Sequence, residues 1–368
     1  MIGSEKKNHE LHFSSYPAPL ELTTAYIKQH STVVRLKGHR TASLALDILI
    51  SILKRLSWRA AYRAGKAVGL LLYVLRIRRK IAMINLGIVY GATKSPAEKE
   101  KIYKASLVNF GRLVVNYLRI PFFGESFWRN HCEWKNEEIL KNAMNQQKGA
   151  ILIAGHIGMM DLAGGKLGMS GYPTFLVGKS IKHPVINHFV HRVRNLINLG
   201  TIKHKESIRR ILKGLRRGEA IVMAVDQNMK KKQGIFIDWM GWAAASVRAP
   251  AIVVKLTGVP VVAGYMFQKS EDRFELVVTE EVAWEPLPDD PEKELVVNTQ
   301  KQADAIQKII YDHPELWFWI HRRWKRQPEG IPSPYAHLKP RKKKKRSKKK
   351  HENMKFFNHK DTKGKTKK

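Results

Sequence analysis

The chain has 368 residues, of which 43% are hydrophobic, so it can bury one large core or two ordinary domains and is neither fibrous nor wholly disordered. Its 67 lysines and arginines exceed its 31 acidic residues and give a formal net charge of +36 at pH 7. This excess predicts a polyanionic partner, either nucleic acid or the anionic face of a membrane. A single cysteine, Cys132, excludes an internal disulfide framework.

Residues 1–40 show no sustained hydrophobic period and contain Pro17 and Pro19. This composition predicts a poorly ordered lead. The same residues lack the apolar core of a signal peptide, so we expect no export.

Residues 41–94 place aromatic rings and basic clusters between two short apolar runs, Ala42–Leu53 and Ala67–Leu75. Each run is shorter than the roughly 18–20 residues that a membrane-spanning helix needs. Cations and aromatic rings beside short apolar helices are typical of an anchor that lies in the plane of a membrane. We therefore predict a helical membrane-associating segment; an amphipathic helical hairpin packed on the domain is the alternative.

From residue 95 to 330, short apolar runs alternate with stretches of helical spacing, the first of which begins at a Ser95-Pro96 helix-start signal. Strands alternating with helices predict one α/β domain, a mixed and largely parallel sheet flanked by helices. Strands are expected at Gly149–Gly155, Thr174–Val177, Ala220–Val225, Val259–Phe267 and Arg273–Thr279, and helices at 94–118, Met159–Leu167, His183–Ile197, Glu206–Arg217 and Glu294–Asp312.

Residues 331–368 form a tail that becomes low-complexity and rich in lysine and arginine from Arg341 onward. Such a segment buries too little apolar surface to offset the entropy of ordering it, so we predict disorder. Its cations would reinforce attraction to anionic lipid, and they could also bind nucleic acid electrostatically.

The sharpest motif is Gly155-His156-Ile157-Gly158-Met159-Met160-Asp161, directly after a predicted buried strand. Two residues five apart lie about 140° apart on a continuous helix, so His156 and Asp161 can meet only if His156 lies on the turn before the helix. In that arrangement His156 would act as a general base, and the Asp161 carboxylate would fix its tautomer. A structural histidine at a helix start is the alternative.

This motif and the blocks around it resemble the lipid A late acyltransferases, the lauroyl and myristoyl transferases within the lysophospholipid acyltransferase superfamily. The resemblance runs from about Arg76 to Gly330 and ends in Trp317–Lys325 (WFWIHRRWK). It implies a glycerol-phosphate-acyltransferase-like fold with His156 and Asp161 as the catalytic pair. The family usually carries Glu at the acidic position, and this departure weakens any inference about the acceptor.

Other positions gain a role from the same resemblance. Arg192 and Arg194 match a pair of arginines that lie near the family's catalytic cleft, where guanidinium groups can hold phosphate. Asp226 and Gln227 match an Asp-Gln block after a strand. Arg248 replaces a threonine of the family and would add a cation to a loop of the acyl or headgroup pocket. All five are predicted to bind substrate.

The predicted activity is O-acyl transfer from an acyl carrier protein or coenzyme A thioester to a hydroxyl of a membrane glycolipid or lipid A precursor. Patterns for metal ligation, a Walker loop and a nucleophile elbow are missing from the sequence, so neither a metal nor a further cofactor is expected. The predicted location is the cytoplasmic face of a bacterial inner membrane. The alternative is a basic protein that binds membrane surfaces or nucleic acid and retains a vestigial acyltransferase site; nucleic acid is the less favoured partner because no nucleic-acid-binding motif is present.

Overall fold

The computed structural model describes residues 16–18, 20–30, 40–146, 148–203 and 207–338. The chain divides into two compact units, 1–335 and 336–368, and the fold described here is that of the first unit. The predicted disordered tail, 331–368, was wrong at its start, because Tyr335 is buried and its hydroxyl donates to the Asn85 side chain. From position 339 onward the predicted tail lies outside the described residues.

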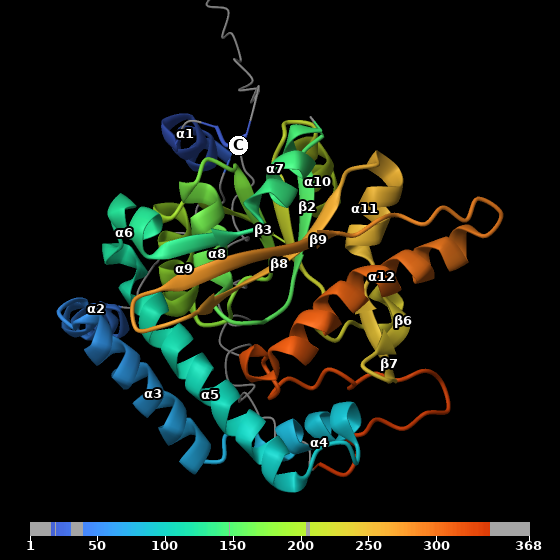
Figure 1. Ribbon diagram of the computed structural model, residues 1–368, viewed down its shortest axis with the longest axis horizontal. Helices are drawn as coiled ribbons and strands as arrows, with labels where there is room; N and C mark the ends of the chain where they lie inside the picture. Colours follow the sequence, from blue (N-terminus) through green and yellow to red (C-terminus); the bar gives the residue numbers. More distant parts are fainter. Residues whose placement is uncertain (1–15, 19, 31–39, 147, 204–206, 339–368) are drawn as a thin grey trace, which may run out of the picture. The chain divides into compact units, whose positions relative to one another are not determined.

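A seven-stranded sheet in the order β1-β9-β8-β2-β5-β3-β4 organises the described part of the chain (Figure 1). Its neighbouring strands are parallel except for β8 and β9, which form an antiparallel pair. The prediction of a mixed, largely parallel sheet is therefore confirmed. The strands are β1 (Cys132–Lys135), β2 (Ala150–Ala154), β3 (Thr174–Gly178), β4 (Leu199–Lys203), β5 (Ala220–Ala224), β8 (Val261–Gln268) and β9 (Phe274–Glu281).

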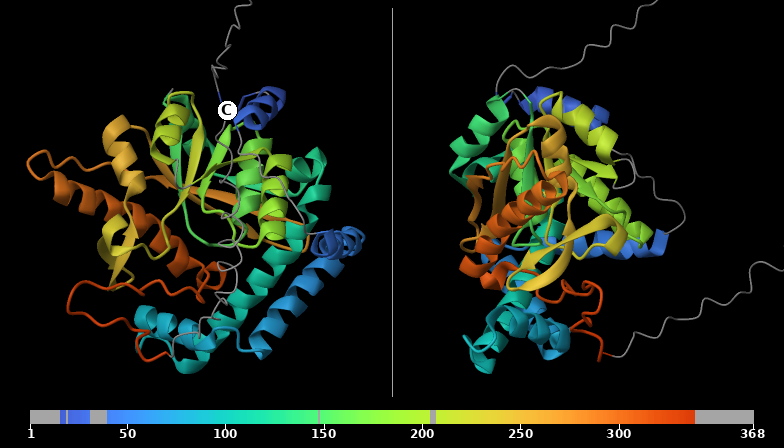
Figure 2. Two further views of the ribbon diagram at one scale, coloured as in Figure 1. Left: turned by 180° about the vertical axis from the view of Figure 1, so that it is seen from behind. Right: turned by 90° about the vertical axis from the view of Figure 1, so that its right-hand side faces the viewer.

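Helices flank this sheet, as Figure 2 shows from the side. Those in the body of the domain are α5 (Pro96–Arg119), α6 (Glu125–Asn130), α7 (Glu137–Asn145), α8 (Met160–Met169), α9 (Pro184–Leu196), α10 (Ser207–Leu215), α11 (Ala249–Thr257) and α12 (Pro291–Asp312). The predicted helix start before α5 is confirmed as a capping box, in which the Ser95 hydroxyl accepts from the Glu98 backbone and the Glu98 side chain accepts from the Ser95 backbone.

Residues 40–90 form three helices, α2 (Arg40–Lys54), α3 (Trp58–Val74) and α4 (Arg79–Tyr90), which confirms the predicted helical character of this segment. Figure 1 shows α3 beside α5. Their backbones approach closely at glycines, because a Cβ on Gly111 would lie 2.3 Å from the Gly65 carbonyl oxygen. In the described ranges, none of the helices combines the length and the apolar content that crossing a bilayer requires.

The predicted poorly ordered lead was wrong for the residues that the structure describes there. Residues 20–30 form helix α1 (Leu20–His30), in which Thr23, Tyr26 and Ile27 are buried. The spacing of these three residues presents one helix face to the domain, where the Tyr26 hydroxyl donates to the Glu219 carboxylate at 2.6 Å. Polar residues surround these three positions in the sequence, so their helical spacing was not recognised.

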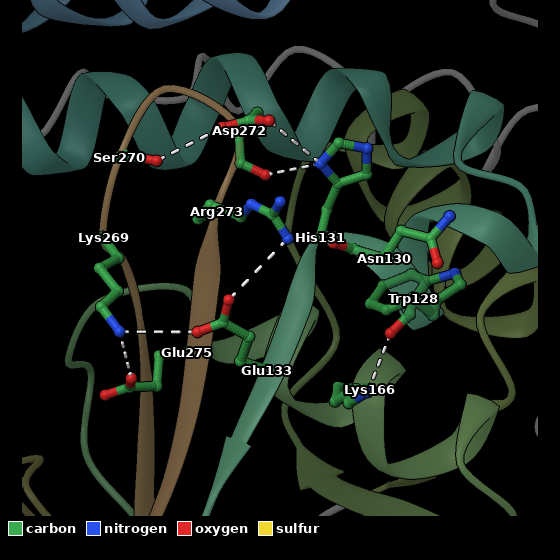
Figure 3. A network of polar contacts seen from close by, with 10 residues as sticks. All are labelled: Trp128, Asn130, His131, Glu133, Lys166, Lys269, Ser270, Asp272, Arg273 and Glu275. Carbon is green, nitrogen blue, oxygen red and sulfur yellow. Dashed lines mark hydrogen bonds and ion pairs between the residues drawn. The ribbon is translucent and has the colours of Figure 1, made fainter.

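Several elements were not predicted because they are short or irregular. They are β1, β4, α6, α7, α11 and the antiparallel hairpin of β6 (Gly234–Trp239) and β7 (Trp242–Val247). Figure 3 shows why the edge strand β1 forms despite its charges: Lys269 contacts Glu275 at 2.9 Å and Glu133 at 3.5 Å, and His131 contacts the Asp272 carbonyl oxygen at 2.9 Å. The contacts of Glu133 and His131 are to residues more than 130 positions away, so no local sequence pattern predicts them.

Candidate active site

The register of two central strands brings the principal polar groups together. Strand β2 pairs in parallel with β5, from Ala150 opposite Ala220 to Ala154 opposite Ala224. The constant offset of 70 residues continues past the strand ends and places His156 opposite Asp226. The carboxyl ends of parallel strands are where sites of α/β proteins form.

His156 and Asp226 make two direct contacts. The His156 backbone N–H donates to Oδ2 of Asp226 at 2.8 Å, and the imidazole Nδ1 lies 2.8 Å from Oδ1. The Trp317 indole N–H also donates to Oδ2, at 2.9 Å. These contacts fix the ring with Nδ1–H toward the carboxylate and leave Nε2 as the basic nitrogen.

The charges of this pair stabilise each other. Burial by itself raises the pKa of Asp226, but the neighbouring His156 and the three hydrogen bonds lower it overall, well below its usual range. For His156, burial lowers the pKa, while the charge of Asp226, the hydrogen bond to it and the charge of Asp161 raise it, and the net direction is upward. The imidazolium that would form on proton uptake therefore has a carboxylate already in place.

The predicted contact between Asp161 and His156 was wrong. His156 does lie on the turn and Asp161 on the first turn of α8, as predicted. The Asp161 carboxylate, however, accepts from Nε and Nη2 of Arg194, both at 3.2 Å. Burial lowers the pKa of Arg194, but the charges of Asp161 and Tyr117 and the hydrogen bonds to them together raise it overall. The His156 imidazole contacts Asp226 instead, because Asp226 follows β5 at the position that lies opposite His156 in the β2–β5 register.

Two further side chains complete the surroundings of the imidazole. Nε2 of His156 lies 2.8 Å from Nε2 of Gln227, whose amide N–H donates to the basic nitrogen. His321 accepts from the Asn228 backbone N–H at 3.3 Å, and burial lowers its pKa to about 4. His321 is thus a buried, neutral imidazole beside the His156–Asp226 pair.

The turn that carries His156 is held by backbone contacts. Gly158 has a φ of +55°, and a Cβ there would lie 2.1 Å from the Met266 carbonyl oxygen. The Met159 N–H donates to that same oxygen at 2.7 Å, and the Gly158 N–H donates to the Leu316 carbonyl at 3.0 Å. Glycine is required here by both the backbone conformation and the space.

A cavity of about 440 Å³ opens beside His156, between the sheet and helices α8 and α9. Most of its lining is apolar and includes Leu152, Leu167, Leu176, Val222, Val262 and Leu276. Polar groups gather on one part of its wall, including His156, Asp161, Arg194 and Gln227. The His156 side chain keeps 28% of its surface exposed, so a hydroxyl can reach it.

The remaining predicted substrate-binding residues differ in their position. Arg194 and Gln227 line the cavity, whereas Asp226 is buried behind His156. Arg192 is exposed on α9, away from the cavity lining, because it lies two residues from Arg194 on the helix. Arg248 is half-buried at the N-terminal end of α11 and follows the lining residue Val247.

Sequence reasoning did not assign Trp317 or Tyr117 to the site. Trp317 belongs to the block WFWIHRRWK, but nothing local in that block indicates which ring meets Asp226. Tyr117, on α5, is half-buried near Asp161 and Arg194; burial, and then the Asp161 charge, raise its pKa well above its usual value. In the part of the chain that the structure describes, no cluster of His, Cys, Asp and Glu side chains could hold a metal ion.

Known proteins match this chain over most of its length. The family model described as bacterial lipid A biosynthesis acyltransferase matches residues 28–326. The chain is 26% identical over 268 residues to the lipid A biosynthesis palmitoleoyltransferase of Escherichia coli (strain K12), covering 71% of this chain and 83% of that protein. It is 23% identical over 284 residues to the lipid A biosynthesis lauroyltransferase of the same organism, covering 76% of this chain and 90% of that protein.

Proposed function

Because the chain belongs to the bacterial lipid A biosynthesis acyltransferase family and is therefore an acyltransferase, we propose that it transfers a fatty acyl group to a hydroxyl of a lipid A precursor or related membrane glycolipid. The proposed donor is an acyl thioester of acyl carrier protein or coenzyme A. The observation that carries this proposal is the His156–Asp226 pair at the polar wall of an apolar cavity.

In the proposed mechanism, Nε2 of His156 takes the proton of the acceptor hydroxyl, and the hydroxyl oxygen attacks the thioester carbonyl carbon. The C–S bond then breaks, and the leaving thiolate recovers the proton from the imidazolium. Asp226 stabilises that imidazolium and holds the tautomer, and no covalent acyl-enzyme forms. The Gln227 amide lies 2.8 Å from Nε2 of His156. In the proposed complex, the acceptor hydroxyl replaces this amide as the hydrogen-bond partner of His156.

The cavity suits the acyl chain of the donor. Its apolar lining would receive the hydrocarbon, and each buried methylene would add about 0.8 kcal/mol of binding free energy. This orientation places the thioester at the polar wall, next to His156.

A direct assay tests this function. We expect the purified protein, mixed with an acyl thioester and a lipid A precursor, to yield a product heavier by one acyl group in mass spectrometry. Parallel reactions with carrier-protein and coenzyme A thioesters identify the donor. Free fatty acid in place of an acylated product would contradict the proposal.

We further propose that helices α2 and α3 contact the cytoplasmic face of a bacterial inner membrane. Five apolar side chains on these helices and Leu75, the residue that follows α3, are 53–72% exposed; the five are Leu44, Ile48, Ile52, Leu71 and Val74. Exposed cations accompany them, namely Lys54, Arg55, Arg59, Arg63 and Lys66. A surface with this combination suits an anionic bilayer, in which the apolar groups enter the interface and each cation adds about 1 kcal/mol.

Removing the apolar stripe of α2 tests this surface. We expect the triple substitution L44S/I48S/I52S to weaken binding to anionic vesicles roughly 10- to 100-fold, because three partly buried aliphatic side chains are lost from the interface. Vesicle co-sedimentation measures the change. The matched control is Leu256→Ser on α11, which removes a side chain that is 64% exposed; an equal loss for the control would count against this membrane surface.

A further inference from the structure

Asn85, on helix α4, is a fully buried polar residue that the proposed mechanism does not use. Its Nδ2 donates to the carbonyl oxygens of Trp319 at 2.6 Å and His321 at 2.7 Å. Its Oδ1 accepts from the Tyr335 hydroxyl at 2.5 Å. The donors and the acceptor of this one side chain are therefore all engaged, and two of its three hydrogen bonds hold the backbone of a distant segment.

That segment, residues 316–321, lies more than 230 positions from Asn85 in the sequence. Within it, the Trp319 backbone N–H donates to the Trp317 carbonyl oxygen at 3.0 Å. The rings of Trp317 and Trp319 are both buried and pack edge to face, with centroids 4.8 Å apart. A side chain that fixes Trp319 therefore also fixes the position of Trp317.

The same segment holds the turn that carries His156. The Leu316 carbonyl oxygen accepts from the Gly158 backbone N–H at 3.0 Å. Ile157 and Trp317 form an isolated antiparallel bridge. The backbone on the carboxyl side of His156 is thus paired with residues 316 and 317.

The segment also holds the carboxylate partner of His156. The Trp317 indole N–H donates to Oδ2 of Asp226 at 2.9 Å. The His321 imidazole accepts from the backbone N–H of Asn228, two residues beyond Asp226, at 3.3 Å. The place of residues 316–321 therefore sets how the carboxylate lies against the imidazole.

We propose that Asn85 is a positioning residue for the His156–Asp226 pair and acts on it through Trp317. This role rests on the proposed function, in which Asp226 stabilises the His156 imidazolium. Asn85 is outside the lining of the cavity beside His156, so it acts without touching the substrates. By holding the 316–321 segment, it keeps the indole N–H on Oδ2 and leaves Oδ1 directed at the imidazole.

Steady-state kinetics of Asn85→Ala and Trp317→Phe test the proposal. Trp317→Phe removes the indole N–H and keeps an aromatic ring. We expect each variant to lower kcat by about 10-fold per folded protein, the scale of one lost hydrogen bond to a charged group. The KM of the donor should change little, because neither residue lines the cavity.

Two matched controls separate positioning from the general cost of disturbing the core. Asn298 is 2% exposed, donates to the Glu285 and Glu294 carbonyl oxygens and accepts from the Glu285 backbone N–H, so Asn298→Ala removes an equivalent set of hydrogen bonds. Trp324→Phe removes a buried indole N–H that donates to the Trp239 carbonyl oxygen. Both controls should keep kcat per folded protein, and an equal loss in them would contradict the proposal.

The double variant Asn85→Ala/Trp317→Phe tests the route of the effect. If Asn85 acts through the indole, the double variant should lose about as much kcat as Trp317→Phe alone, about 10-fold. Independent effects would multiply to about 100-fold, and that result would overturn the proposed route.

A spectroscopic measurement makes the test independent of activity. In ¹⁵N-labelled protein, the Trp317 indole N–H signal is identified by its absence from Trp317→Phe. We expect its proton resonance to move upfield in Asn85→Ala, because the hydrogen bond to the carboxylate weakens, and to stay in place in Asn298→Ala. An unmoved resonance in Asn85→Ala would refute the positioning role. A moved resonance in a protein that transfers no acyl group would support the contact and contradict the proposed function alone.

Discussion

Replacing His156 with alanine is expected to reduce acyl transfer by about 10²- to 10⁴-fold, the usual contribution of a general base. The variant removes the nitrogen that takes the acceptor proton and leaves Asp226 without its imidazole partner. Transfer of a labelled acyl group from thioester to lipid measures the loss. Donor binding should be retained, because the apolar cavity wall is unchanged.

Two comparisons make this result specific. His183→Ala, an exposed position at the start of α9 with no capping contact, should keep full activity. The melting temperature of His183→Ala should stay near that of the wild type, whereas His156→Ala leaves the buried Asp226 carboxylate without its imidazole partner and should lower it, so activity is compared per folded protein. If His156→Ala retained full transfer, or if a cellular phenotype depended on residues 341–368 and not on His156, the alternative of a binding protein with a vestigial site would be favoured.

The Asp226→Asn variant is expected to have the second largest effect, a loss of about 10²-fold or more in kcat. The amide cannot stabilise the imidazolium, and its NH₂ group favours the wrong tautomer of His156. Asp226 also accepts from Trp317, so the melting temperature must be measured in parallel. A loss of folded protein would be corrected for with the folded fraction measured by circular dichroism.

The dependence on pH distinguishes Asp226 from Asp161. The Asp226 charge raises the pKa of His156, and the base must be neutral to act, so activity rises as pH increases through that pKa. Removing the charge lowers the pKa, and the rising limb of the kcat/KM profile should move to lower pH. Asp161→Asn should move the rising limb less, because the Asp161 charge raises the pKa of His156 less than the Asp226 charge does. The same substitution removes the carboxylate partner of Arg194. A larger displacement for Asp161→Asn would restore the originally predicted pairing.

Local patterns predicted the core elements of the fold well. The runs GAILIAG and AIVMAV became the central strands β2 and β5, and the alternation of strands with helices correctly indicated a largely parallel sheet. These signals are strong because buried strands must be continuously apolar. The resemblance to lipid A acyltransferases was also confirmed by the family match over residues 28–326.

Short elements escaped prediction where distant residues stabilise them. Strand β1 depends on Lys269 and Asp272 at the β8–β9 turn, and helix α1 depends on Glu219. The membrane contact of α2 and α3, and the catalytic role of each candidate residue, stay predictions that the experiments above address.

By itself, the sequence determined the place of His156, the proposed general base, because a buried strand, two glycines and a helix start define that turn locally. Only the tertiary structure decided which carboxylate it meets. The contact depends on the register of β2 against β5, which aligns His156 with Asp226 across 70 residues and leaves Asp161 to Arg194. Strand register is a property of the assembled sheet, so spacing along the chain could suggest a partner but could not select it.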